Sequence, residues 1–220
     1  MPPELLSCVE LETGSDPQHA VIWLHGLGAD GHDFEPIVDA LALPEDISIR
    51  FIFPHAPVRP VTINGGMRMR AWYDFLQLIP GKGESRADIT ASVDAVKSLI
   101  VHEQERGIAE QNIVLAGFSQ GGVIALLTGL FGPYRLAGIM GLSTYLPRWS
   151  SLPIGEEMPP VFLAHGRFDD VLPFTLGAQA RDDLVGAGYD LEWHEYPMPH
   201  SVSNEEVEAI SRWLQKVLAR

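Results

Sequence analysis

Residues 113–121 read Ile-Val-Leu-Ala-Gly-Phe-Ser-Gln-Gly, and they carry more structural information than any other stretch of the chain. The apolar residues at the start are typical of a buried strand. The residues that follow fit the pattern Gly-x-Ser-x-Gly, in which a sharp turn between a strand and a helix lifts a serine hydroxyl above the edge of a sheet. A helical pattern over residues 119–131 follows at once. The segment therefore predicts a strand, a tight turn that presents Ser119, and a helix, which is the setting of a nucleophilic serine.

Short apolar runs of the same kind lie on both sides of this segment and alternate with longer helical patterns. Near-continuous apolar strands are typical of parallel sheets that are covered on both faces. The alternation therefore predicts an α/β fold with right-handed crossovers. The predicted strands are residues 20–24, 49–53, 113–116, 136–142, 161–164 and 191–196, and the predicted helices are residues 88–106, 119–131 and 204–218.

The composition describes an acidic globular chain. Hydrophobic residues make up 46% of the 220 residues, which is enough to form a sizeable core. No linker rich in proline, glycine or serine divides the chain, so residues 1–220 are predicted to form a single domain. The formal net charge is −14. Because so acidic a chain repels the phosphates of nucleic acids and of anionic lipids, neither is an expected partner.

Cysteine content and the N-terminus bear on the cellular compartment. Cys8 is the only cysteine, so the chain cannot form an internal disulfide or a cysteine-rich zinc site. Cys8 lies in an apolar stretch and is expected to be an inert core residue. We find no signal peptide, and no stretch approaches the ~18–20 apolar residues of a membrane span. These features predict a cytoplasmic protein without a membrane span.

A nucleophilic serine needs a base and an acid. In the Gly-x-Ser-x-Gly arrangement both follow the serine in the chain, the acid first and the histidine last. His200 lies between the predicted strand 191–196 and the last predicted helix, where that base is expected. Asp169 and Asp170 both follow the run 161–164, at the carboxyl end of a predicted strand. We prefer Asp169 and keep Asp170 as the alternative, because composition does not separate adjacent aspartates.

A carbonyl oxygen that becomes negatively charged needs two backbone N–H donors. The N–H of Gln120, the residue after the serine, is expected to be one of them. The other is expected from the loop after an early strand, residues 25–31, where glycines on either side of Leu27 allow the backbone to turn inward. The sequence therefore predicts an oxyanion hole built from Leu27 and Gln120.

The same loop also fits two other kinds of site. Gly26, Gly28 and Gly31 match a dinucleotide-binding fingerprint, but the end of the next predicted strand lacks the acidic residue that such a site requires. His25 and the polar residues up to Asp33 could suggest a metal site, but their spacing matches no familiar ligand pattern. We therefore expect neither an organic cofactor nor a metal ion.

Residues 54–82 interrupt the alternation of strands and helices. They lack a helical period and contain prolines and glycines, yet they hold many large apolar side chains. A loop of this length is usually functional or disordered, and the apolar content argues against disorder. We expect an ordered excursion that forms an apolar wall of a pocket. Trp72 is the candidate substrate-binding residue, and the alternative is that Trp72 belongs to the core.

Several short motifs follow one another along most of the chain. They are His25-Gly26-Leu27-Gly28-Ala29-Asp30, residues 59–66 (RPVTINGG), Trp72-Tyr73-Asp74, residues 116–122 (AGFSQGG), residues 142–145 (LSTY) and His165-Gly166-x-x-Asp169. Together they resemble the carboxylesterase/acyl-protein thioesterase family, and especially its bacterial carboxylesterases. The resemblance runs from Val21 to the C-terminal helix.

This resemblance implies a compact single-domain α/β-hydrolase with a mostly parallel central sheet, helices on both faces and no large lid domain. It favours Asp169 over Asp170, because the acid of the family is the one in His-Gly-x-x-Asp. Pro199 is a departure, since the family often has glycine before the histidine, and proline would stiffen that loop. Family members often dimerise. The implied site residues are the nucleophile Ser119, the acid Asp169, the base His200, and the oxyanion donors Leu27 and Gln120.

The sequence thus predicts a serine hydrolase that cleaves carboxylic esters of short to medium acyl chains through an acyl-enzyme intermediate. The nearest alternative is an acyl-protein thioesterase or a lysophospholipase, because the same triad serves each and only the pocket and surface differ. A ligand-binding receptor on a hydrolase scaffold is the alternative from another class, and a nicotinamide oxidoreductase is the third. The expected partners are a small ester or thioester substrate and a second copy of the chain.

Overall fold

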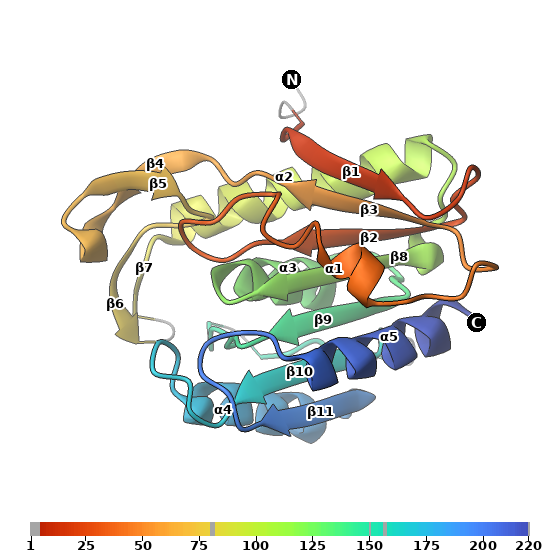
Figure 1. Ribbon diagram of the computed structural model, residues 1–220. Coiled ribbons are helices and arrows are strands. Elements are labelled where there is room, and N and C mark those ends of the chain that lie inside the picture. The colour runs from red at the N-terminus through yellow and green to blue at the C-terminus, as the bar shows by residue number, and fades with distance from the viewer. Residues whose placement is uncertain (1–4, 80–81, 150, 156–157, 220) are drawn as a thin grey trace.

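The computed structural model describes residues 5–79, 82–149, 151–155 and 158–219, and Figure 1 shows one central sheet with helices on both faces. Within these residues the sheet has seven strands in the order β1-β3-β2-β8-β9-β10-β11. The edge strand β1 pairs antiparallel with β3, and the other pairs are parallel. The strands are β1 (Cys8–Glu12), β2 (His19–Leu24), β3 (Ile49–Pro54), β8 (Ile113–Phe118), β9 (Gly138–Leu142), β10 (Val161–Gly166) and β11 (Leu191–Tyr196).

Helices cover both faces of this sheet, as the apolar strands predict. Successive residues of one strand enter two different cores: Ile22 of β2 packs on one face of the sheet and Trp23 packs on the other. Among the described residues, no helix combines the length and the apolar character that crossing a membrane requires. The first face is covered by α2 (Arg86–Glu105), α3 (Gln120–Phe131) and α4 (Phe174–Gly186), and the second by α1 (Ile37–Ala40) and α5 (Asn204–Leu218).

Serine side chains cap two of the predicted helices, and the first of these begins at Arg86, two residues before its predicted start. Ser85 Oγ accepts the Asp88 N–H before α2, and Ser203 Oγ accepts the Glu206 N–H before α5. The sequence analysis missed β1 and α4. Among the described residues, α4 has no side-chain hydrogen bond at its N-cap, Pro173. The serine cap that marks α2 and α5 is therefore missing there.

The ordered excursion predicted for residues 54–82 contains, within its described residues, strands of two β-hairpins; residues 80–81 lie outside the described residues. The first pairs β4 (Val58–Val61) with β5 (Met67–Arg70), joined through the short 3-10 helix η1 (Thr62–Asn64). The second pairs β6 (Phe75–Ile79) with β7 (Lys82–Glu84). In Figure 1 both hairpins lie at the edge where the parallel strands end. The prediction of an ordered segment is confirmed, and the hairpins lie where a parallel α/β sheet assembles a ligand site.

Candidate active site

Ser119 lies at a strained turn between β8 and α3. Its φ is 55° and its ψ is −120°. A non-glycine residue in such a region costs about 1–3 kcal/mol and persists only where its surroundings hold it. The Ser119 N–H donates to the Leu142 carbonyl at 2.9 Å, and the Thr144 hydroxyl donates to the Ser119 carbonyl at 2.7 Å. Contacts from β9 and the segment after it therefore hold the turn that the sequence predicts.

The two glycines of the motif are required by close backbone approach. A Cβ added to Gly117 would lie 2.4 Å from the backbone of Gly121, and a Cβ added to Gly121 would lie 2.4 Å from the Leu24 carbonyl oxygen. Backbone atoms cannot yield as a flexible side chain can. Glycine is therefore required at both positions of the Gly-x-Ser-x-Gly motif.

Asp169 and His200 come together at the carboxyl ends of β10 and β11. His200 Nδ1 lies 2.7 Å from Asp169 Oδ2, and Asp169 Oδ1 accepts the backbone N–H groups of Val171 and Leu172. Asp170 is exposed to solvent. The structure therefore places Asp169, and not its neighbour, against the histidine that the sequence analysis selected.

The His200 ring also lies beside the serine turn. Its centroid is 4.7 Å from the ring centroid of Phe118, the residue before Ser119. The loop that carries His200 follows β11, whereas Phe118 ends β8, so the tertiary fold brings the two segments together. All three residues predicted as a triad thus follow the carboxyl ends of parallel strands, at one edge of the sheet.

His165 is a site residue that sequence reasoning did not assign. Its Nε2 lies 2.9 Å from the Leu172 carbonyl oxygen and 3.3 Å from Asp169 Oδ2. Burial would raise the pKa of Asp169, but hydrogen bonds from His165, from His200 and from the Leu172 N–H outweigh it and hold that pKa well below its ordinary value. Asp169 is therefore an ionised carboxylate with both oxygens held in place. The His-Gly-x-x-Asp motif was the only sequence signal for this histidine.

The loop with the predicted oxyanion donor Leu27 is held by His25. The His25 Nδ1 lies 2.7 Å from the Gly26 carbonyl oxygen, and its Nε2 accepts the Ala56 N–H at 3.0 Å. Burial lowers the pKa of His25 to about 4, so the ring is neutral near pH 7. Both ring nitrogens are used by backbone groups, which agrees with a structural role for this histidine.

Leu27 and Gln120 both line the cavity that lies beside Ser119. Within the described part of the chain, the Leu27 N–H has no backbone acceptor. The Gln120 N–H belongs to the first turn of α3, where N–H groups have no acceptor inside the helix. Gly26, next to Leu27, approaches the Ser119 side chain so closely that an added Cβ would lie 3.6 Å from the Ser119 Cβ. The predicted oxyanion donors are therefore adjacent to Ser119 in space.

Trp72 is fully buried and does not line the cavity beside Ser119. Its backbone N–H donates to Gln120 Oε1 at 2.7 Å, and its indole N–H donates to the His25 carbonyl at 2.8 Å. Gln120 Nε2 in turn donates to the Tyr73 carbonyl at 2.7 Å. The predicted substrate contact of Trp72 is therefore corrected: Trp72 is a core residue that joins the excursion to the serine turn, and Tyr73 lines the cavity instead.

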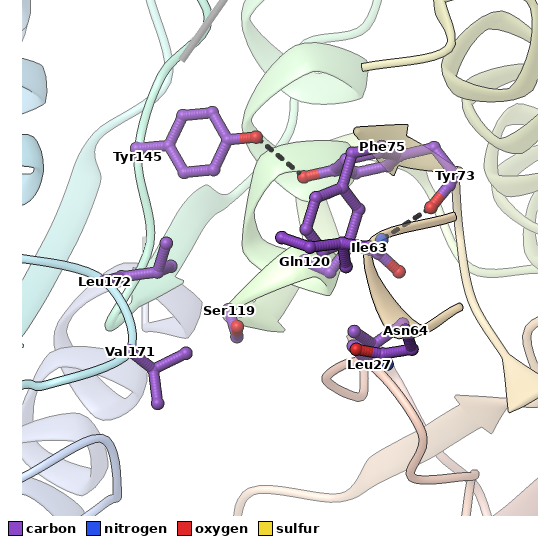
Figure 2. A pocket seen from close by; sticks show the side chains of 10 residues that line it. All are labelled: Leu27, Ile63, Asn64, Tyr73, Phe75, Ser119, Gln120, Tyr145, Val171 and Leu172. Carbon is purple, nitrogen blue, oxygen red and sulfur yellow. Dashed lines mark hydrogen bonds between the residues drawn. The ribbon is translucent and has the colours of Figure 1, made fainter. Parts of the chain in front are cut away.

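A cavity of about 190 Å³ lies beside Ser119 (Figure 2). Both hairpin segments contribute to it, together with the loop after β2, the segment after β9 and the turn after β10. Most of its lining is apolar, as the sequence analysis expected of a wall built partly by residues 54–82. The lining residues are Leu27, Ile63, Asn64, Tyr73, Phe75, Ser119, Gln120, Tyr145, Val171 and Leu172.

A mostly parallel sheet with a serine at a strained strand–helix turn, and an Asp–His pair at the ends of later strands, defines the α/β-hydrolase class. The sequence matches the phospholipase/carboxylesterase family over residues 6–218. The chain therefore belongs to that family, which is one of serine hydrolases.

The loop that matches the dinucleotide fingerprint is not followed directly by a helix, because α1 begins only at Ile37.

Curated relatives and solved structures agree with this assignment. The chain is 37% identical to acyl-protein thioesterase 1 of Neurospora crassa, over all of this chain and 93% of the relative. It is 36% identical to acyl-protein thioesterase 1 of Mycosarcoma maydis, over 94% of each chain. The crystal structure of SOBER1 from Arabidopsis thaliana superposes with a TM-score of 0.82 at 33% identity, over 91% of this chain and 99% of that one. Acyl-protein thioesterase 2 of Zea mays superposes with a TM-score of 0.82 at 27% identity, over 96% and 99% of the two chains.

The predicted likeness to bacterial carboxylesterases in particular is not supported. The curated relatives named above are fungal. The crystal structure of the carboxylesterase from Bacillus cereus shares only 20% identity with this chain, which shows a common fold alone.

Proposed function

We propose that the protein is an acyl-ester and acyl-thioester hydrolase in which Ser119 is the nucleophile, His200 the base and Asp169 the acid. The observation that carries this proposal is the position of Ser119. It lies on a strained turn, in the wall of an apolar cavity, with the Asp169–His200 pair at the same edge of the sheet. The buried and ionised Asp169 would keep the His200 ring oriented and favour its protonated form during the reaction.

The reaction has two halves. In the first, Ser119 Oγ attacks the acyl carbon while His200 takes the hydroxyl proton, and the oxyanion is stabilised by the N–H groups of Leu27 and Gln120. His200 then gives the proton to the leaving alcohol or thiol as its bond to the acyl carbon breaks. In the second half, His200 removes a proton from water as the water oxygen attacks the acyl carbon. The bond between that carbon and Ser119 Oγ then breaks, His200 returns the proton to Ser119 Oγ, and the carboxylic acid leaves.

The relatives favour the thioesterase alternative over the preferred prediction, an esterase for short to medium acyl chains. Two of them are named acyl-protein thioesterase 1 and match nearly the whole chain. We therefore take acylated protein, attached through a thioester, as the main proposed substrate. The small cavity favours a second candidate, an esterase of shorter acyl chains, because about 190 Å³ is less than the roughly 300–1,000 Å³ of most ligand pockets.

A chain-length series of acyl thioesters beside matched oxygen esters tests this proposal and separates the two candidates. We expect kcat/KM to favour thioesters at equal chain length if the thioesterase proposal holds. A preference for oxygen esters at every length would support the second candidate instead.

The nucleophile is tested with a fluorophosphonate probe, which reacts with activated serines. The probe should label the native enzyme and leave Ser119→Ala unlabelled, and kcat should fall by about 10⁴–10⁶, because triad members act as a unit. Ser98→Ala, at a surface serine of α2, is the matched control and should label normally. Labelling of Ser119→Ala, or none of the native protein, would contradict the proposal, and the latter would favour a receptor.

A further inference from the structure

Two tyrosine hydroxyls meet at the wall of the cavity beside Ser119. The oxygens of Tyr73 and Tyr145 are 3.0 Å apart. Both residues line the cavity and both are almost fully buried, with exposed fractions of 2% and 7%. Water therefore has little access to replace this hydrogen bond, and each hydroxyl must find its partner within the protein.

The direction of the hydrogen bonds follows from a third residue. Tyr145 donates its hydroxyl proton to Glu84 Oε1 at 3.0 Å. A hydroxyl has only one proton to donate, so the Tyr73 hydroxyl is the donor in its bond to Tyr145. Burial raises the pKa of both phenols, and both therefore stay protonated at neutral pH. The result is a chain of hydrogen bonds that runs from Tyr73 through Tyr145 to Glu84.

These hydrogen bonds join the hairpin of β6 and β7 to a segment that is far from it in the sequence. Tyr73 precedes β6, Glu84 lies in β7, and Tyr145 follows β9. In Figure 2 the hydroxyl–hydroxyl bond spans one side of the cavity, above Ser119, with Leu172 and Phe75 on either side. Because both hydroxyls are held, neither ring can rotate out of the cavity without breaking buried hydrogen bonds.

We propose that Tyr73 and Tyr145, held together through Glu84, form the end wall that limits the length of the acyl chain bound beside Ser119. This inference rests on the proposed function, since it assigns the cavity to the acyl group. The two rings present apolar surface to the cavity while their hydroxyls bond to each other and to Glu84. The wall is therefore apolar enough to contact methylene groups and is fixed in position.

The test uses kcat/KM for acyl esters and thioesters of two to sixteen carbons. Each methylene that enters an apolar pocket contributes about 0.8 kcal/mol, or roughly fourfold in kcat/KM. We expect kcat/KM of the native enzyme to rise with chain length and then to fall beyond a certain length, which we call the break. In Tyr145→Ala the break should move to longer chains by two carbons or more, so that the ratio of kcat/KM above and below the native break rises by about tenfold or more.

Two further variants separate a wall from a merely structural role. Tyr145→Phe keeps the ring but loses both hydrogen bonds, so the break should stay at the same length and become shallower. Tyr189→Ala is the matched control, because Tyr189 is also 7% exposed and its hydroxyl also bonds within the protein, to the Pro153 carbonyl, but it does not line the cavity. It should lower the melting temperature without moving the break.

A break that stays in place in Tyr145→Ala, or one that moves equally in Tyr189→Ala, would overturn the proposed wall. Calorimetric binding of fatty acids to Ser119→Ala and to Ser119→Ala/Tyr145→Phe gives a readout that needs no turnover. If the native enzyme showed no hydrolase activity, the proposed function would be refuted. If the affinity for fatty acids also depended less on their length in the double variant, the proposed wall would still be supported. A length dependence that is identical in both proteins would refute the wall.

Discussion

The strained backbone of Ser119 is held by hydrogen bonds from a neighbouring strand and from the segment after that strand. Its positive φ is unfavourable for a serine, yet backbone and side-chain hydrogen bonds from β9 and Thr144 hold it there. Ser143 nearby also has a positive φ, 44°, and donates its N–H to the Ala164 carbonyl. Strain of this kind tends to collect at functional sites, where the surrounding structure compensates for it.

The hydrogen bonds of Asp169 predict a large difference between two neighbouring aspartates. Asp169→Asn should keep the fold, because its remaining oxygen can still accept from the Leu172 N–H, but it should favour the wrong tautomer of His200. We expect kcat to fall by about 10⁴ in Asp169→Asn and by less than about tenfold in Asp170→Asn. Steady-state kinetics of the two purified variants, with circular dichroism as a check of folding, measures this. A large loss of kcat in Asp170→Asn, with near-native kcat in Asp169→Asn, would show that the acid is misassigned.

At the scale of elements, the segment between β3 and α2 is attached to the serine turn through one glutamine. The Gln120 side chain accepts a hydrogen bond from the Trp72 N–H and donates one to the Tyr73 carbonyl. The Ser92 hydroxyl of α2 donates to the Trp72 carbonyl as well. The first hairpin is attached to the loop after β2, because the Gly28 N–H donates to the Arg70 carbonyl at 2.9 Å. These bonds position the walls of the cavity relative to Ser119.

Truncation of Trp72 should therefore act on stability. We expect Trp72→Ala to lower the free energy of unfolding by about 3–5 kcal/mol, as for other large buried aromatic side chains. The chain-length profile of the folded fraction should stay unchanged, because Trp72 does not line the cavity. Trp72→Phe keeps most of the ring volume and should cost less. Urea unfolding and kcat/KM across the ester series measure both effects. A shifted chain-length profile at unchanged stability would show that Trp72 lines the pocket after all.

At the scale of the whole molecule, both faces of the sheet are sealed by helices, and every site residue lies at one edge. Among the described residues, Arg50 and Glu103 illustrate buried charged groups that are paired with each other, and Glu206 on α5 differs from them. Glu206 is fully buried, and neither of its carboxyl oxygens has a hydrogen-bond partner among the described residues. Burial raises the pKa of Glu206 to about 8.

This carboxyl predicts a loss of stability as the pH rises. Below the ordinary pKa of 4.5 the group is protonated in both the folded and the unfolded chain. Between that value and about 8, the unfolded chain releases the proton while the folded chain keeps it, so the free energy of unfolding falls as pH rises. Asp169 acts in the opposite sense, because its lowered pKa means that stability is lost as the pH falls through acidic values.

Glu206→Gln removes the titrating group and should flatten this dependence. Urea unfolding between pH 5 and pH 8 should show the variant gaining stability relative to the native protein as the pH rises. Glu208→Gln, at an exposed position of the same helix, is the control and should follow the native curve. Parallel curves for the native protein and Glu206→Gln would contradict the assignment.

Local signals in the sequence accounted for much of the fold and for the three proposed triad residues. The strand, the glycines and the serine of residues 113–121 lie next to one another, so their geometry is readable from spacing alone. The same holds for the caps Ser85 and Ser203, whose hydrogen bonds reach only three residues along the chain. The caps form between close neighbours without any distant contact. The sequence pattern around Ser119 is equally local, although hydrogen bonds from Leu142 and Thr144 hold the strained turn once the chain has folded.

Only the tertiary structure decided which side chains line the cavity. Trp72 and Tyr73 are adjacent, equally aromatic and equally buried, and the packing of the excursion turns one into the core and the other toward Ser119. The meeting of Tyr73 with Tyr145, and of His165 with Asp169, depends on where separate segments pack after folding. Side-chain direction at such positions is set by contacts across many residues of chain, and those contacts have no periodic or local signature in the sequence.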